Sequence, residues 1–458
     1  MRKITILSTS CALICGVALM VSPVQAETYS AESGFSSAYE AAFRHDPELR
    51  AAYLNYRAEV EEAPLAFGRL LPNISLNAGY SYEDSENFFT QNPTNTDDPR
   101  ADGKIHEHHW GVNLDQPLFN IGAWRSYQAA QQGVAASSLR YSQAERELIV
   151  RVTDAYLRLL FAARQEFLYQ KQLETIELQI DQAQRQQDLG IGDRITLLEI
   201  RAQQDLVRAD LLEARSRYAD ARTLLENMTG QMLDVPSEWQ RAEHQPLPNA
   251  RLLSEEEWMS RALGNLSYQE AQARVRQAQR MRDARRADHY PTVNLNLNYT
   301  DRESDDDYRT RESYRVGIDL NLPLFQGGRS QAGLRQADSR MQAEMARSDQ
   351  SLAQASQQVR LNYNRVTSLS QRLAALRQSE LSTRSFLEAA IRGQELNLRS
   401  KIDVLDARSQ LLNVQLRYAE ALQNYLEADM QLHHAVGDLT PARLRYYDEL
   451  FSRLVDAG

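Results

Sequence analysis

The sequence has very little cysteine, and the positions of its two cysteines exclude several kinds of site. Cys11 and Cys15 are the only cysteines among the 458 residues, and both lie in an N-terminal segment with a basic start and an apolar stretch. Because this segment ends in the small-x-small pattern Val24-Gln25-Ala26, we expect residues 1–26 to be a secretory signal peptide. The exported chain would then contain no disulfide, no reactive thiol and no metal site with cysteine ligands.

Long apolar runs, excess positive charge and catalytic motifs are missing as well. A mean hydropathy of -0.56 excludes a membrane protein built of many apolar helices, and a net charge of -10 argues against nucleic-acid binding as the main role. The arginine-rich stretch 274–286 is therefore interpreted as a solvated helix face. No nucleophile–base grouping or zinc motif is present, so we predict no enzyme activity, no cofactor and no metal site.

Three neighbouring histidines could suggest a metal site, namely His106, His108 and His109. No acidic or histidine partner lies at the spacing that ligands on a helix require. We interpret the three residues as the end of a strand, close to the outer headgroups of a membrane.

Proline is absent from two long stretches, and this absence predicts long helices. Residues 118–235 and 324–440 contain no proline, a residue that costs about 3 kcal/mol inside a helix. Both stretches are rich in Ala, Gln, Leu, Arg and Glu, which favour helices. A helix over residues 122–188 would be about 100 Å long at 1.5 Å per residue, which is too long for the core of one globular domain.

Apolar residues recur every seven positions in the second stretch, as in a coiled coil. The row consists of Met345, Leu352, Val359, Val366 and Leu373. The chain is expected to reverse near Gly190 to Gly192 and near Asn397, because glycine and asparagine suit the left-handed conformation that ends a helix. We therefore predict two long antiparallel helical hairpins, over about 122–230 and 327–437.

The two halves of the chain resemble each other, which indicates a tandem duplication. A shift of about 207 residues places Gln187–Gly190 on Gln394–Asn397, and a shift one residue shorter places Pro117–Phe119 on Pro323–Phe325. The duplication divides the chain into a first repeat, an equatorial linker, a second repeat and a C-terminal segment: residues 27–235, 236–260, 261–440 and 441–458.

Before each predicted hairpin the apolar pattern changes to strict alternation, which predicts strands. The four predicted strands cover residues 72–83, 108–118, 291–301 and 313–323. Each is about ten residues long with one apolar face, as in a tilted strand that crosses a bilayer. The alternative is a soluble sandwich with one wet face, but that fold does not explain a signal peptide and helices about 100 Å long together.

Four strands cannot close a barrel, because the smallest membrane barrels need about eight. An open sheet edge in lipid would leave backbone groups without hydrogen bonds, at several kcal/mol each. The barrel must therefore be shared between chains. Three copies would supply twelve strands, and counting alone leaves two or four copies open. The interior of such a barrel would hold water, and the long helices would continue it into the periplasm.

Several motifs in the chain resemble the TolC family of outer-membrane channel-tunnel proteins. They are Asp46-Pro47-Glu48-Leu49, Leu71-Pro72, Pro117-Leu118-Phe119, Tyr290-Pro291, Pro323 to Gly328 and Ile402-Asp403-Val404-Leu405-Asp406-Ala407. The resemblance covers nearly the whole exported chain. It implies a mixed α+β membrane protein, a homotrimer with a 12-stranded barrel and an α-barrel of coiled-coil hairpins. It also implies export of proteins or small toxic molecules, together with a periplasmic adaptor and an inner-membrane ABC or proton-driven transporter.

The resemblance further implies a gate at the periplasmic tips of the hairpins. Asp403 and Asp406 share one helix face, and in a trimer they would form stacked carboxylate rings that attract cations. The family places this pair at the closed aperture, where Arg399 would help tie the tips together. Ser400 and Asp403 also match a capping box, which is a structural role. Thr196 stands where relatives often carry an acidic residue, so the bonds of this lock are expected to differ.

The tips are also the expected contact for the adaptor. The residues assigned to this contact are Gly190, Gly192, Asp193, Asn397 and Ser400. We predict an outer-membrane export duct. The alternative is a soluble periplasmic coiled-coil adaptor or scaffold that forms no pore; a degradative surface enzyme would need a nucleophile and base that are absent. The sequence leaves the cargo open, because the pump selects it, with a slight preference for protein.

Overall fold

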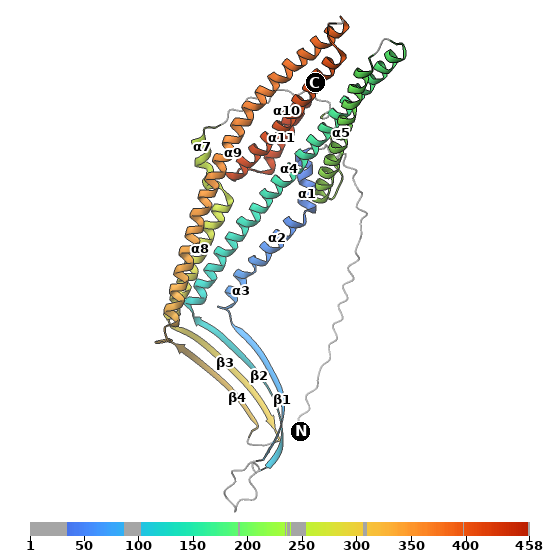
Figure 1. Ribbon diagram of the computed structural model, residues 1–458. Helices are drawn as coiled ribbons and strands as arrows, with labels where there is room; N and C mark the ends of the chain where they lie inside the picture. The colour runs from blue at the N-terminus through green and yellow to red at the C-terminus, as the bar shows by residue number, and fades with distance from the viewer. Residues whose placement is uncertain are drawn as a thin grey trace, which may run out of the picture. The chain divides into compact units, whose positions relative to one another are not determined.

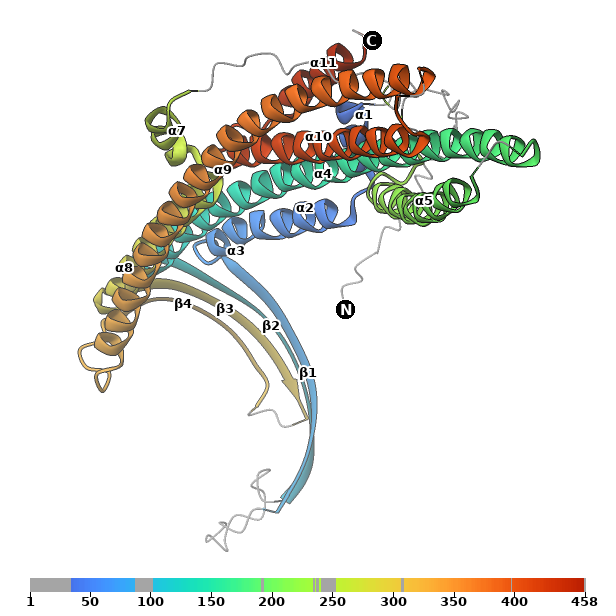
Figure 2. The same ribbon diagram turned by 45° about the horizontal axis from the view of Figure 1, so that its top comes forward.

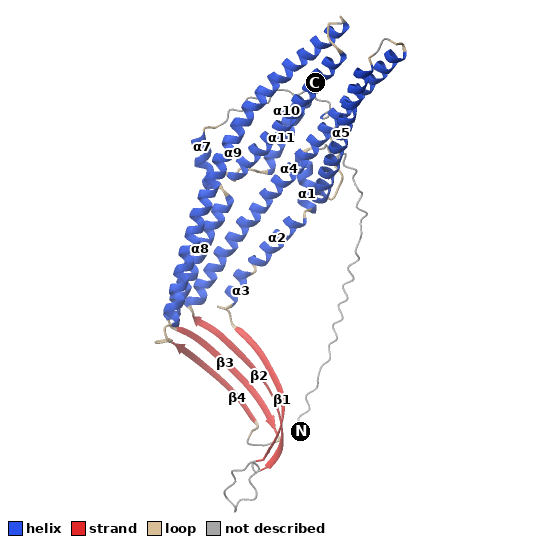
Figure 3. Cartoon of the chain, in the orientation of Figure 1, coloured by secondary structure: helices blue, strands red, loops and turns tan. Residues whose placement is uncertain are grey.

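The structure is a computed structural model, and it describes residues 34–86, 102–190, 193–233, 235, 239, 253–305, 309–396 and 398–456. The same order of elements occurs twice along the chain: short helices, then two strands, then two long helices (Figure 1). Helices and strands are separated by colour in Figure 3.

The four strands form one antiparallel sheet in the order β1-β2-β3-β4. Their bounds are β1 Asn73–Glu86, β2 Asp102–Phe119, β3 Thr292–Ser304 and β4 Arg311–Asn321. β1 and β4 lie at the two edges, so each is paired with a described strand on one side only (Figure 3).

The first strand pair is longer than the alternating pattern predicts. Pairing of β1 with β2 continues to Glu86 opposite Asp102, past the predicted bounds 72–83 and 108–118. Ladder hydrogen bonds join backbone groups, so polar residues extend a strand without any apolar alternation. β3 and β4 differ from their predicted bounds by at most three residues, and Pro323, which has no N–H to donate, falls outside β4.

One face of the sheet is apolar across all four strands. Ile74 lies opposite Leu114, Leu114 opposite Leu297, and Leu297 opposite Val316. These side chains are not covered by the rest of the chain, since Ile74 is 65% and Val316 66% exposed. The sheet thus presents an apolar surface to its surroundings and a polar surface on its other face.

Two hairpins of long helices follow the strand pairs. The first is formed by α4 (Ile121–Asp188) and α5 (Arg194–Thr229), and the second by α9 (Arg329–Glu395) and α10 (Lys401–Ala435). Within each hairpin the two helices pack along each other, and α4 and α10 bring the two hairpins into contact (Figure 2). None of the described helices is long and apolar enough to cross a membrane.

Local signals fix the ends of the long helices. The Asn120 side chain accepts a hydrogen bond from Ala123 N at 2.9 Å and caps α4. Gly230 ends α5 with φ +70°, a conformation that favours glycine.

Shorter helices pack along the long helices of the hairpins. They are α1 (Phe35–His45), α2 (Pro47–Val60), α3 (Glu62–Gly68), α7 (Glu255–Arg261), α8 (Leu266–Arg286) and α11 (Pro441–Asp456), with the 3-10 turns η1 (Ala262–Gly264) and η2 (Ala287–His289). α2 and α3 contact α4, whereas α8 lies between α4 and α9.

The largest buried cluster joins the first and last described helices to the hairpins. Phe35 of α1 contacts Tyr156 of α4 and Phe451 of α11, with ring centroids 4.9 Å apart in both pairs. The Trp239 ring lies tilted against the Phe451 ring, with centroids 4.8 Å apart, and its Nε1 donates to the Leu160 carbonyl at 3.0 Å. The predicted linker 236–260 is thus anchored in the core, at least at Trp239 and at the buried Trp258 of α7.

Candidate functional site

The tip of the second hairpin is organised around Asp403. Ser400 N donates to Asp403 Oδ2 at 2.9 Å, and Asp403 N donates to Ser400 Oγ at 3.1 Å, so the capping box is present. Nη1 of Arg399 lies 4.0 Å from Asp403 Oδ1. The hydrogen bonds from Ser400, and then the charge of Arg399, lower the pKa of Asp403, which therefore stays ionised under ordinary conditions.

Asp406 lies three residues further along α10 and is exposed. Val404, Leu405 and Ala407, its neighbours in sequence, are all buried. Among the described residues its carboxylate has no hydrogen-bond or ion-pair partner. Asp403 thus caps the start of α10 and also exposes a negative charge, whereas Asp406 only exposes a negative charge.

The tip of the first hairpin forms a separate group. Asp193 caps α5 by accepting a hydrogen bond from Ile195 N at 3.1 Å, and Thr196 Oγ1 lies 3.4 Å from Asp193 Oδ2. Gly190 reverses the chain with φ +75°. Thr196 therefore bonds to its own hairpin, and among the described residues no bond joins it to Arg399. Gly192 and Asn397 lie outside the described residues.

Two contacts that sequence reasoning missed join the hairpins near their tips. Lys401 Nζ, at the start of α10, donates to Gln186 Oε1, near the end of α4, at 2.5 Å. Leu405 of α10 belongs to a buried cluster whose other members, Ile176 and Ile200 among them, come from the first hairpin. The heptad spacing of Leu405 marks it as a core residue, but nothing in the sequence indicates the partner of Lys401.

Gly393 allows the close approach of Arg399. Leu398 N and Arg399 N both donate to the Gly393 carbonyl, at 2.7 and 3.2 Å. A Cβ at Gly393 would lie only 2.9 Å from Cγ of Arg399. The turn from α9 to α10 therefore brings the Arg399 side chain against the backbone of Gly393, where a larger residue would not fit.

The polar face of the sheet carries rows of amides. Asn113 donates to Asn77 at 3.0 Å, and Asn298 in turn donates to Asn113. Asn296, in the neighbouring row, donates diagonally to Asp319 of β4, which lies one row nearer the helices. These bonds run across β1, β2, β3 and β4 and satisfy polar groups that face away from the apolar surface.

The three histidines lie near the far end of β2, as the alternation predicts. His106 Nδ1 is 2.5 Å from the Tyr80 hydroxyl, and His108 Nε2 is 3.1 Å from Glu303 Oε2. Within the described part of the chain no group of three or more His, Cys, Asp or Glu residues could hold a metal ion.

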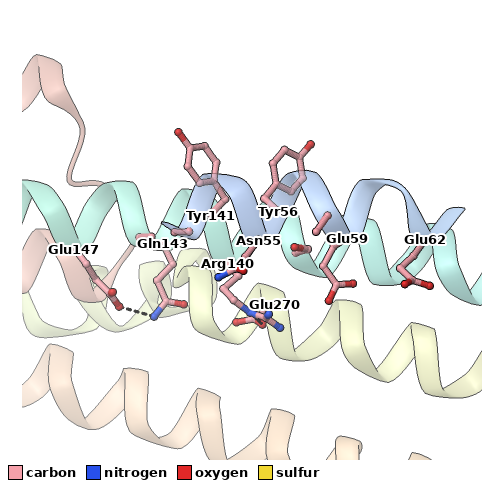
Figure 4. A pocket seen from close by; sticks show the side chains of 13 residues that line it. Asn55, Tyr56, Glu59, Glu62, Arg140, Tyr141, Gln143, Glu147 and Glu270 are labelled. Atoms are coloured by element: carbon pink, nitrogen blue, oxygen red, sulfur yellow. Dashed lines mark hydrogen bonds and ion pairs between the residues drawn. The ribbon is translucent and has the colours of Figure 1, made fainter. Parts of the chain in front are cut away.

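A groove of about 550 Å³ with several polar groups is lined by residues of α2 and α4 and by Glu270 of α8 (Figure 4). Arg140 and Glu270 form an ion pair there, with Nε and Oε1 3.0 Å apart, and Glu147 accepts a hydrogen bond from Gln143 at 2.8 Å. Burial, and then the Glu145 carboxylate, raise the pKa of Tyr141 to about 12, so this phenol remains protonated. The groove brings together no activated nucleophile with a base.

Arginines of α8 pair with nearby acids. Arg274 lies 2.7 Å from Glu270, and Arg285 lies 3.7 Å from Asp288. This pairing fits a solvated helix face better than a binding site for nucleic acid.

Comparison with known proteins identifies a common architecture. The sequence model of the outer membrane efflux protein family matches residues 38–231 and 258–438. The alkaline protease secretion protein AprF of Pseudomonas aeruginosa is 29% identical over 420 residues, covering 90% of this chain and 86% of AprF. The outer membrane protein TolC of Escherichia coli is 27% identical over 455 residues, covering 93% of this chain and 88% of TolC.

The fold agrees with solved structures of much lower sequence identity. The open state of the MtrE outer membrane channel of Neisseria gonorrhoeae superposes with a TM-score of 0.75 at 20% identity, covering 89% of this chain and 90% of MtrE. At this identity the likeness concerns the fold alone.

Proposed function

Since this chain belongs to the outer membrane efflux protein family, the TolC family of channels, we propose that it is a trimeric exit duct. It is a channel protein of the outer membrane with helices in the periplasm, and not an enzyme. The duct carries cargo across the periplasm and the outer membrane when it is docked to a pump of the inner membrane.

The two open edges of the sheet carry the proposal. The apolar face is suited to lipid, yet β1 and β4 would each leave one row of backbone groups without partners there. Pairing of β4 with β1 of another copy satisfies both rows. Three copies of four strands give a closed barrel of twelve strands, and its amide-rich polar face then surrounds water.

The hairpin tips form the periplasmic gate. Threefold symmetry gathers Asp403 and Asp406 into carboxylate rings, which favour cations and bind multivalent cations as a plug. Arg399 forms an ion pair with Asp403 at the second tip, and Thr196 donates a hydrogen bond to Asp193 at the first tip. The bond from Lys401 to Gln186 and the packing of Leu405 support a closed state, because they join the two hairpins.

The exposed tips are the docking site of a periplasmic adaptor. Gly190, Gly192, Asp193, Asn397 and Ser400 contact the adaptor, which links the duct to an ABC or proton-driven transporter. Protein is the favoured cargo, because the chain is similar along 90% of its length to a protein named for alkaline protease secretion. Export of small toxic molecules is the other possibility within the same duct.

Cysteine crosslinking between sheet edges tests the ring. Without its signal peptide the chain has no cysteine, so Asn77→Cys on β1 can be combined in turn with Ser313→Cys, Gly317→Cys or Asp319→Cys on β4. Each pair tests one register between β4 of one copy and β1 of the next. In one of the three, the Cα atoms of the two cysteines should lie within about 7 Å of each other, and the protein should run as a covalent trimer on a non-reducing gel.

The matched control combines Asn77→Cys with Asn294→Cys on the inner strand β3, and it should remain uncrosslinked. Chains that crosslink in none of the three registers, or that recover as a soluble monomer from the periplasm, would favour the scaffold instead.

A further inference from the structure

Charge is distributed unevenly along the polar face of the sheet. At the end next to the helices this face carries Asp115 on β2 and Asp319 on β4. Asp115 lies in a row with Asn73 and Asn296, and Asp319 lies one row nearer the helices, opposite Asn294. Both carboxylates are exposed, so this end of the face is negative.

Farther from the helices, the unpaired charges of this face are positive among the described residues. Arg315 lies opposite Asn298, and Arg311 lies opposite Arg302. Arg302 is neutralised by Glu107, with Nε and Oε1 3.3 Å apart. Arg311 and Arg315 are exposed, and neither side chain has a hydrogen bond or ion pair with another described residue.

We propose that Arg311 and Arg315 form a cationic lining, here called the arginine belt, that favours anions in the part of the barrel farther from the helices. The proposal rests on the proposed function, because threefold symmetry turns two arginines per chain into two rings of three around the lumen. The ligands it selects are small anions and acidic segments of a passing polypeptide, since rings of arginine line pores that are selective for anions.

The spacing of the two rings makes them act together. The two residues are four apart on one strand, hence about 13 Å at 3.3 Å per residue. The Debye length is about 10 Å at 0.1 M salt, so the potentials of the two rings overlap at or below this concentration. At 1 M salt the Debye length falls to about 3 Å, and the belt should lose its effect.

The arginine belt and the aspartates of the gate have opposite signs and act in series. The narrower of the two dominates the selectivity of the whole duct. The belt is therefore measured in the background Asp403→Asn/Asp406→Asn, in which the carboxylate rings are neutral.

The test is the reversal potential in planar bilayers under a KCl gradient at or below about 0.1 M. The gate-neutral background keeps the carboxylates of Asp115 and Asp319, so its own permeability ratio is the reference for the arginine changes. Adding Arg311→Gln and Arg315→Gln should raise the potassium-to-chloride permeability ratio at least about twofold at low salt, with no such shift near 1 M.

Glu312→Gln is the matched control. It removes a charge one residue from Arg311, but on the opposite face of β4, and should leave the ratio unchanged. All variants are first compared for trimer stability on gels. If the trimer conducts but its permeability ratio does not respond to the arginine changes, the proposal of an arginine belt is wrong, whereas the proposed export duct is still supported. If the parent protein does not conduct at all, the proposed function fails and the belt fails with it.

Discussion

At the scale of single residues, the two aspartates near the second tip differ in what holds them. Asp403 is tied to Ser400 and Arg399, whereas Asp406 has no such partner among the described residues. Replacing Asp403 therefore disturbs the start of α10 as well as the gate. Asp406 is the cleaner site for testing charge alone.

We predict that Asp406→Ala weakens block by multivalent cations and raises single-channel conductance. Arg399→Ala should also raise conductance, because it removes the guanidinium that lies beside Asp403. Both effects are measured in planar bilayers, with the exposed Arg280→Ala on α8 as a control. Conductance and cation block that match those of the parent protein would place the gate elsewhere.

His433 predicts a dependence of stability on pH. Its ring is buried, Nε2 accepts a hydrogen bond from Arg443, and Nδ1 faces Asp438 Oδ2 at 3.3 Å. Burial lowers the pKa of His433 from its ordinary 6.5, with Arg443 acting in the same direction and Asp429 and Asp438 opposing it. The unfolded chain therefore binds a proton more readily than the folded one.

The sign follows from this difference in proton binding. The stabilisation due to neutral His433 is complete above the unfolded pKa and is lost as the pH falls below it. The apparent melting temperature, followed by circular dichroism, should therefore decrease as the pH is lowered from about 7.5 to about 5.5. His433→Gln should flatten this slope and the exposed His289→Gln should not; equal slopes in all three proteins would contradict the assignment.

At the scale of elements, the sequence predicted what depends on local pattern. Two stretches without proline became the helices α4, α5, α9 and α10, and alternating apolar residues became the strands. The polar extension of β1 and β2 was not predicted, because ladder bonds leave no trace in side-chain pattern. The anchoring of Trp239 was also missed, since packing between residues distant in sequence has no local signal.

The equatorial packing supplies a prediction for stability. Trp239→Ala removes ring contacts with Phe161 and Phe451 and the hydrogen bond to the Leu160 carbonyl. A large-to-small change at such a buried position costs about 3–5 kcal/mol. The apparent unfolding temperature should drop clearly, whereas Phe43→Ala, at a side chain that is 44% exposed, should change it little. A Trp239→Ala protein as heat-stable as its parent would show that this segment does not hold the core together.

At the scale of the whole molecule, the candidate site was only partly predictable. Sequence motifs selected Asp403, Asp406 and Arg399, and the structure brings Arg399 and Asp403 together. The link from Lys401 to Gln186 depends on which elements become neighbours, and so does the pairing of Arg302 with Glu107 across two strands. Such juxtapositions follow from the fold and not from spacing along the chain.

The central claim is that copies of this chain enclose a continuous aqueous path through a bilayer, and the conductance of the purified protein in planar bilayers tests it most directly. We predict discrete current steps that multivalent cations block from the side of the hairpin tips. Protein that inserts into the bilayer as a stable assembly but does not raise the conductance of the bilayer would contradict the account.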